Sequence, residues 1–169
     1  MADFTRTRGF NISTPGCHIS GVAAGDDSSA AISQDGRCFE WGRIHAFDNK
    51  NGNKVHFEEN PFMSQSEDIR FEQSRFYTVR CDGKFGIALD IQGRVWSQGN
   101  RPLGALGLGR QMITRKYALI TGFPADVFVT AISCGRNSSG AITRDGDVYV
   151  WGKEYNTNDP VANRLRSRS

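Results

Sequence analysis

The sequence predicts an all-β fold built from three copies of one antiparallel unit. The first observation is a repeat without gaps, because VAAGDDSSAAISQDGRCFEWG at residues 22–42 returns as ISCGRNSSGAITRDGDVYVWG at residues 132–152. The second is a degraded copy between them, VRCDGKFGIALDIQGRVWSQG at residues 79–99. The third is the spacing of the copies, which is close to the ~50 residues of propeller-type repeats. Together they predict a partial β-propeller of about three four-stranded antiparallel blades.

The strands within each copy follow from its turn and its alternation. Asp-Gly at residues 35–36 and 145–146 stands between short alternating runs, which is typical of a tight hairpin. Along residues 148–151, alternation places Tyr149 and Trp151 on one face of the strand and two valines on the other. We therefore expect this strand to be buried on both faces.

The boundaries of the copies predict three segments. An Asn-Gly pair, Asn51-Gly52, indicates an extra hairpin within an insertion at residues 43–60. The expected organisation is an N-terminal segment at residues 1–18, three repeats within 19–152 (about 19–60, 75–110 and 127–152), and a C-terminal tail at 153–169, flexible or bound to a partner.

The composition is that of a turn-rich globular chain and excludes several classes. Hydrophobic residues make up 38% and glycines number 19, unlike disordered or collagen-like chains. A net charge of +3 is too small to indicate a nucleic-acid partner by itself. The four cysteines stand singly, as reduced thiols do, and no run approaches the ~20 apolar residues of a membrane span. We expect an intracellular protein, cytoplasmic or nuclear, with no membrane association.

The order of residue types in the copies points to a known family. Residues 134–152 present Cys-Gly, Ala-Ile, Asp-Gly, Val-Tyr and Trp-Gly in that order, and Asn100 with residues 104–109, Gly-Ala-Leu-Gly-Leu-Gly, follows the middle copy. This pattern resembles the regulator of chromosome condensation repeat family, whose copies carry a Gly-Gln-Leu-Gly loop. The resemblance implies a propeller, usually of seven blades, whose founding member is an exchange factor for a Ran-type GTPase with histone and DNA contacts.

The resemblance also assigns structural roles to glycines and tryptophans. Trp41 and Trp151 are expected to fill blade cores, and Trp96 to take the place that Tyr149 has in the last copy. The sequence departs from the family at Ser28, Phe85 and Ser138, where histidine is common. The expected structural positions are Gly25, Gly36, Trp41, Gly42, Gly93, Trp96, Gly99, Gly135, Gly146, Trp151 and Gly152.

Enzymatic and metal chemistry are not indicated by the pattern. His18, His45 and His56 lack the i, i+3 or i, i+4 spacing of metal ligands. The serine pairs at residues 28–29 and 138–139 recur without a histidine or an acid, unlike a hydrolase triad, and are expected to satisfy turn backbone groups. No cofactor, metal or small-molecule substrate is expected, and the strand-borne cysteines are expected to be buried.

Three blades are fewer than the ~4 to 8 with which propellers close, so an open arc would expose two apolar blade faces. We expect association with another copy, with a second chain bearing further blades, or within a large assembly. Candidate contacts lie in the least repeat-like segments, at residues 43–60, 101–116 and 153–164, and in the basic end that follows them. They are Arg43, His45, Phe47, Arg101, Arg110, Arg115, Arg164, Arg166 and Arg168.

The leading hypothesis is a non-catalytic interaction or scaffold module. The resemblance leaves open guanine-nucleotide exchange, or chromatin-associated regulation, of a Ran-type GTPase. A structural subunit of a large particle or cytoskeletal assembly is a third hypothesis. Basic ends, with Arg6, Arg8 and the run at residues 163–169, are either disordered or bind nucleic acid or an acidic groove.

Overall fold

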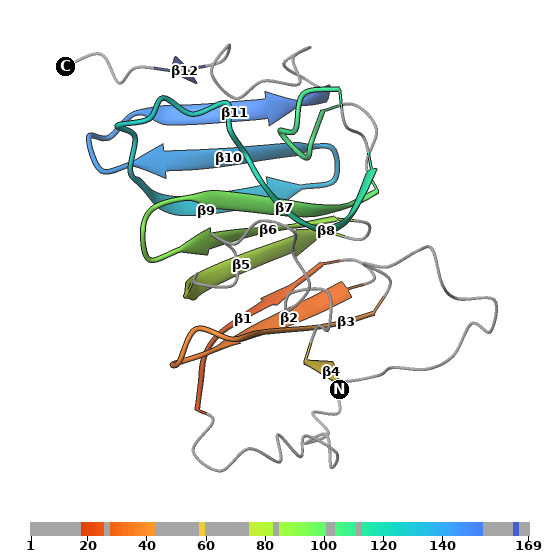
Figure 1. Ribbon diagram of the computed structural model, residues 1–169. Coiled ribbons are helices and arrows are strands. Elements are labelled where there is room, and N and C mark those ends of the chain that lie inside the picture. Colours follow the sequence, from red (N-terminus) through yellow and green to blue (C-terminus); the bar gives the residue numbers. More distant parts are fainter. Residues whose placement is uncertain are drawn as a thin grey trace, which may run out of the picture.

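The computed structural model shows three sheets stacked one after another along an arc (Figure 1). It describes residues 18–25, 28–42, 58–59, 75–82, 85–100, 104–110, 113–153 and 164–165. Within these residues each sheet has four antiparallel strands joined in chain order. The prediction of an all-β fold with three four-stranded blades is confirmed.

The strands of the three blades are consecutive in the chain. Blade 1 contains β1 (Ile19–Ala24), β2 (Ser28–Ser33), β3 (Cys38–Gly42) and β4 (Glu58–Glu59). Blade 2 contains β5 (Phe76–Asp82), β6 (Phe85–Asp90), β7 (Val95–Asn100) and β8 (Ile113–Leu119). Blade 3 contains β9 (Val129–Gly135), β10 (Ser138–Thr143), β11 (Val148–Gly152) and β12 (Arg164–Leu165). The first strands β1, β5 and β9 lie side by side.

The fourth strands of blades 2 and 3 extend past the ends predicted for those repeats. β8 begins at Ile113, and β12 lies inside the segment predicted as a tail, where Leu165 pairs with Val148 and Arg164 with Tyr149. The Asp-Gly signal identifies the central hairpin of a blade, but a two-residue strand carries no alternation to read. The domain boundaries therefore stay predictions.

The hairpin between the second and third strands is built in the same way in every blade. Its glycine has a positive φ, of +86° at Gly36, +75° at Gly93 and +83° at Gly146, which favours glycine over other residues. The side chain three residues earlier accepts a hydrogen bond from the N–H that follows the glycine. The pairs are Ser33 with Arg37 at 3.0 Å, Asp90 with Arg94 at 2.9 Å and Thr143 with Asp147 at 3.1 Å.

The core consists of two layers of side chains, one in each junction between blades. The layer between blades 1 and 2 contains Ala30, Ile32, Cys38, Phe76, Val79, Cys81, Ala88, Trp96 and Tyr117. The layer between blades 2 and 3 contains Phe85, Ile87, Leu89, Val95, Ala105, Leu106, Ile120, Val129, Ile132, Ala141, Tyr149 and Trp151. Blade 2 is thus apolar on both faces because each face has a neighbour.

The middle blade keeps an aromatic residue at the position of Tyr149 and gives it a buried carboxylate as a partner. Trp96 pairs with Ala88 in the register that Tyr149 has with Ala141, and it is fully buried. Its Nε1–H donates to the buried Asp90 carboxylate at 3.0 Å, which also forms an ion pair with Arg94 at 2.7 Å. A buried charge that is paired and hydrogen-bonded in this way is tolerated in a core.

Candidate interaction surface

The junction between blades 2 and 3 shows how one blade binds the next. Residues 104–110, which follow β7, reach across to blade 3. The Trp151 Nε1–H and the Ser139 hydroxyl both donate to the carbonyl oxygen of Ala105, each at 2.9 Å. All three residues are buried, so both hydrogen bonds are shielded from water. This loop thereby joins the two blades through the backbone carbonyl of Ala105 and through its buried apolar side chains.

The loop fits against Trp151 because of a glycine. Gly107 has a φ of +68°, and a Cβ there would lie 2.8 Å from Trp151 Nε1. Leu106 is buried in the same layer, and its carbonyl accepts a hydrogen bond from the Ser97 hydroxyl at 2.7 Å. Phe123 closes the layer by an edge-on contact with Trp151, with ring centroids 5.9 Å apart. Ala105, Leu106 and Gly107 of the Gly-Ala-Leu-Gly sequence thus each have a role in the junction.

The turn glycines also take part in the junctions. The Gly93 carbonyl of blade 2 accepts a hydrogen bond from the Val129 N–H, at the beginning of blade 3, at 3.1 Å. A Cβ on Gly93 would lie 2.7 Å from the ring of Phe128. In the first junction, the Gly36 carbonyl accepts a hydrogen bond from the Phe76 N–H at 3.2 Å. A Cβ on Gly36 would lie 2.8 Å from the Cβ of Arg75. At Gly146 of blade 3, a Cβ would meet nothing within 4 Å.

The outer face of blade 3 carries apolar side chains without a neighbouring blade in the described part of the chain. Ile142 is 46% exposed, whereas Ile32 and Leu89, in the same register of blades 1 and 2, are 0% exposed. Val148 and Val150 beside it are half-buried. We call Ile142, Val148, Val150 and Gly146 the last open face.

The expectation that β11 is buried on both faces is therefore wrong for the described residues. Tyr149 and Trp151 are fully buried against blade 2, but the two valines belong to the last open face. Alternation shows that both faces of a strand are apolar, and it does not show whether a neighbour covers each of them.

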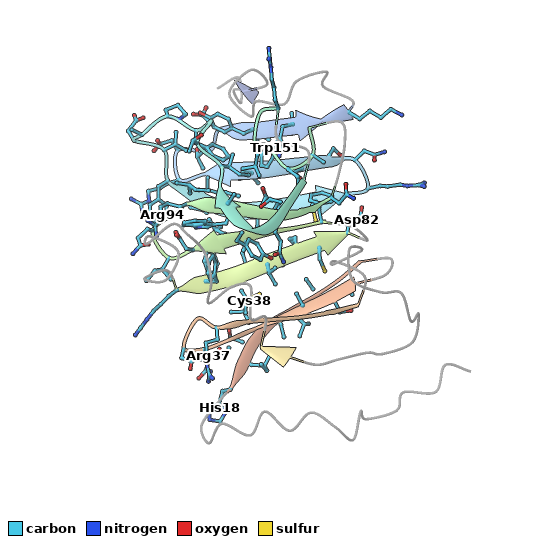
Figure 2. The ribbon with its side chains drawn as sticks, turned by 45° about the vertical axis from the view of Figure 1, so that its right-hand side comes forward. His18, Arg37, Cys38, Asp82, Arg94 and Trp151 are labelled. Atoms are coloured by element: carbon cyan, nitrogen blue, oxygen red, sulfur yellow. The ribbon has the colours of Figure 1, made fainter. Side chains whose placement is uncertain are left out.

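The outer face of blade 1 is the mirror case at the other end of the arc. Val22 is 73% exposed, whereas Val79 and Ile132, in the same register of blades 2 and 3, are 2% and 6% exposed. Ala24, two residues further along the same strand, is exposed as well. We call Val22 and Ala24 the first open face. His18, the residue before β1, lies at this free end (Figure 2).

Comparison with known proteins agrees with this geometry. The regulator of chromosome condensation (RCC1) repeat matches residues 129–158, which include β9, β10 and β11. Human E3 ubiquitin-protein ligase HERC2 is 31% identical over 143 residues, which cover 83% of this chain. The chain carries a regulator of chromosome condensation repeat and is similar to proteins with such repeats over most of its length. The recognition from sequence is confirmed.

Further relatives place the repeats in proteins of other kinds. Arabidopsis thaliana RUG3, a mitochondrial RCC1 domain-containing protein, is 28% identical over 137 residues, covering 80% of this chain and 31% of the relative. The human regulator of chromosome condensation is 34% identical over 71 residues, covering 41% of this chain and 16% of the relative. The chain spans only 3% of HERC2, so these relatives carry much that the chain does not.

Solved structures of the family share the fold. Human WBSCR16 matches with a TM-score of 0.66 at 20% identity, over 92% of this chain and 41% of that protein. Prp20p of Saccharomyces cerevisiae matches with a TM-score of 0.67 at 14% identity, over 89% and 39% respectively. The repeat protein is thus an arc of a β-propeller, and each of these structures is more than twice as long.

Many of the candidate contacts lie outside the described residues. These are Arg43, His45, Phe47, Arg101, Arg166 and Arg168. The strands β8 and β12 contain Arg115 and Arg164, whose side chains are not described, and Arg110 is exposed at the end of the interblade loop. From the sequence, the two open faces were predicted only because three blades are too few to close a ring. That prediction did not name Val22 or Ile142.

The residues expected to be structural occupy equivalent backbone positions. Gly99 and Gly152 have φ values of +126° and +118° at the end of the third strand, where Gly42 ends β3. Gly25 approaches blade 2 closely, since a Cβ there would lie 2.7 Å from the Cys81 carbonyl oxygen. Gly135 has no such constraint, with the Ser138 hydroxyl 3.9 Å away.

The backbone group that Ser139 satisfies lies in the turn at residues 104–106 of another blade, and not in its own hairpin. The Ser139 hydroxyl donates to the Ala105 carbonyl of blade 2, 34 positions away in the chain. The alternation of β10 directs Ser139 to the face that Ala141 shares, which packs on blade 2. A serine next to a hairpin and a serine across a junction look alike in a single sequence.

The described part of the chain holds no group of three or more metal-ligating side chains that could bind an ion. Nor does it contain a helix of the length and apolarity that a membrane crossing requires.

Cys134 provides a chemical test of the second junction. Burial raises the pKa of its thiol to about 12, and the nearby Cys81 and Asp82 act in the same direction. A raised pKa keeps the thiol protonated, so at pH 8 only ~1 in 10⁴ molecules carries the reactive thiolate. We expect alkylation by iodoacetamide at pH 8 to be at least ~100-fold slower than in urea-unfolded chain. Mass spectrometry of the Cys134 peptide measures this ratio, and equal rates would show an open junction.

Proposed function

We propose that this chain is a non-catalytic protein-interaction module whose two open faces bind protein surfaces. The observation that carries the proposal is the contrast at equivalent positions. Val22 and Ile142 are 73% and 46% exposed at the ends of the arc, while their counterparts inside it are between 0% and 6% exposed. An apolar patch of this kind, with the shape of an existing interface, is typical of a docking surface.

The relatives support a protein partner. The structure of Prp20p is described together with its binding to Gsp1p and histones, and a second structure of yeast RCC1 (Prp20) is bound to Kap60. The proteins that bind these partners are longer, and this chain spans 39% and 30% of the two solved chains. The proposal takes from them only the class of partner, a protein, and takes no catalytic activity.

Charge substitutions on the open faces test the proposal. In affinity purification from the native source, Val22→Lys and Ile142→Lys are expected each to reduce recovery of a partner by at least ~10-fold, because a lysine must be desolvated in an apolar interface. Ile91→Lys is the matched control, since Ile91 is 53% exposed but lies at the hairpin tip of blade 2. All three variants should keep the wild-type Tm.

The proposal fails if every protein that purifies with the wild-type chain is recovered equally with Val22→Lys and with Ile142→Lys. It also fails if Ile91→Lys reduces recovery as much as they do, because binding would then use the hairpin tips.

The basic end of the chain adds an electrostatic contribution to the proposed binding. Deleting residues 164–169 would also remove β12, so substitution isolates the charge better than truncation. With Arg166→Gln and Arg168→Gln together, we expect the affinity for the partner to fall and its salt dependence to become weaker. Titrations at about 50 and 200 mM salt measure both quantities. An unchanged salt dependence would show that these two arginines do not contribute to binding.

A further inference from the structure

The second junction shows which residues of a blade receive the loop of the blade before it. In blade 3, Ser139 on β10 and Trp151 on β11 are paired across the two strands, and both donate to the Ala105 carbonyl. These two donors form the receiving half of the contact. Residues 104–107, Gly-Ala-Leu-Gly, form the supplying half.

Blade 1 contains the same pair of residue types in the same register. Ser29 on β2 is paired with Trp41 on β3, just as Ser139 is paired with Trp151. Blade 2 does not, because glycine and glutamine, Gly86 and Gln98, occupy these two positions. Blades 1 and 3 therefore carry the receiving half, and blade 2 has neither the serine nor the tryptophan.

The distribution of the pair follows the loop of the preceding blade. Blade 3 follows a Gly-Ala-Leu-Gly loop and has the pair, whereas blade 2 follows residues 43–60, which contain no Gly-X-Leu-Gly sequence, and lacks it. A buried hydroxyl and a buried indole N–H are costly without an acceptor, so the donors are kept where an acceptor arrives. By the same logic, the pair in blade 1 indicates an acceptor loop from a blade that packs on the first open face.

We propose that the first open face accepts a propeller blade that ends in a Gly-X-Leu-Gly loop, whose X carbonyl accepts hydrogen bonds at Ser29 and Trp41. This proposal rests on the proposed function and names the kind of surface that the first open face binds.

A second copy of this chain does not fit that description. Its outermost blade, blade 3, is followed by residues 153–163, Lys-Glu-Tyr-Asn-Thr-Asn-Asp-Pro-Val-Ala-Asn, which contain neither glycine nor leucine. The loop that would fit, at residues 104–107, is already held by blade 3 of the same molecule. The occupant is therefore a regulator of chromosome condensation repeat of another sequence, and head-to-tail pairing of identical chains would leave the donors of blade 1 without the acceptor.

An extra blade inserted into the chain tests the proposal. A copy of residues 75–127 is placed between Cys17 and His18 of the full chain, so that the copied loop precedes blade 1 as the original precedes blade 3. The comparison protein has the same insertion with its copy of residues 104–107 replaced by Ser-Ser-Ser-Ser. We expect a higher Tm for the insertion with the intact loop and at least ~5-fold lower hydroxyl-radical labelling of Val22 than in the unextended chain.

A substitution in blade 1 makes the test specific for the donor pair. Ser29→Ala is expected to lower the Tm of the protein with the intact loop and to leave the Tm of the Ser-Ser-Ser-Ser protein nearly unchanged, which is the signature of a coupled contact. Equal Tm values for the two insertions, or equal effects of Ser29→Ala in both, would overturn the proposal. Reversible dimers of the unextended chain that Ser29→Ala weakens would also overturn it, in favour of a second copy.

These outcomes are separable from those of the proposed function. If Val22→Lys prevents partner binding while the two insertions behave alike, the open face is a docking surface but not for a Gly-X-Leu-Gly blade. If Val22→Lys has no effect on partner binding while the insertions differ, the receiving half is present but the natural partner does not use it.

Discussion

Replacing Trp151 by alanine is expected to lower the free energy of unfolding by ~3–5 kcal/mol, the largest effect of any single change considered. The indole is fully buried between blades 2 and 3, contacts Phe123 edge-on and donates to the Ala105 carbonyl. Alanine would leave a cavity and would leave that carbonyl with Ser139 as its donor among the described residues. Chemical denaturation followed by far-UV circular dichroism measures the loss.

The preceding residue provides the control for this change. Val150 lies on the same strand, faces the last open face and is half-buried, so Val150→Ala is expected to cost below ~1 kcal/mol. The two substitutions differ mainly in whether a neighbouring blade covers the side chain. Equal costs would mean that the junction around Trp151 does not contribute to stability as the structure indicates.

Replacing Gly93 by alanine is expected to be the second largest change, at ~2–4 kcal/mol. A positive φ costs an L-residue ~1 kcal/mol, and the added methyl group would overlap the Phe128 ring at 2.7 Å, which adds ~1–3 kcal/mol. The methyl group would also strain the hydrogen bond by which the Gly93 carbonyl holds the Val129 N–H. Equilibrium unfolding in urea measures the difference from the wild-type chain.

Gly146 is the matched control for Gly93, because it has the same turn and a similar φ of +83° but no neighbour within 4 Å of an added Cβ. Gly146→Ala should therefore cost only the ~1 kcal/mol of the backbone conformation. If both substitutions destabilise the chain equally, the turn glycine is needed for its φ alone and the contact with the next blade adds nothing. If the natural partner covers blade 3, Gly146→Ala should also weaken its binding.

Local signals in the sequence were sufficient to predict the blades and their central hairpins. An Asp-Gly pair between alternating runs specifies a turn with a positive φ, and this is where Gly36 and Gly146 lie. The middle copy lost the aspartate, yet Gly93 adopts the same conformation, with Asp90 accepting the N–H that follows it. Spacing identified this copy because the turn still requires a glycine with a positive φ, although the side chains around it differ from those of the other copies.

The contacts between blades could not be predicted, because they join residues far apart in the chain. Ser139 and Ala105 illustrate this, since neither residue type announces an interblade hydrogen bond. Ile142 is exposed and Leu89 is buried, although both are apolar residues in the same register of their blades. They differ only in whether another blade follows in the described part of the chain. A repeat makes such differences readable once the register of every copy is known.

Hydroxyl-radical footprinting of the chain alone and in complex with its natural protein partner tests the central claim most directly. Val22, Ile142 and Ile91 are exposed apolar side chains that report on the first open face, the last open face and a hairpin tip. We expect labelling of Val22 or Ile142, or of both, to fall several-fold in the complex while labelling of Ile91 stays the same. Unchanged labelling of Val22 and Ile142, with Ile91 protected, would contradict binding through the open faces.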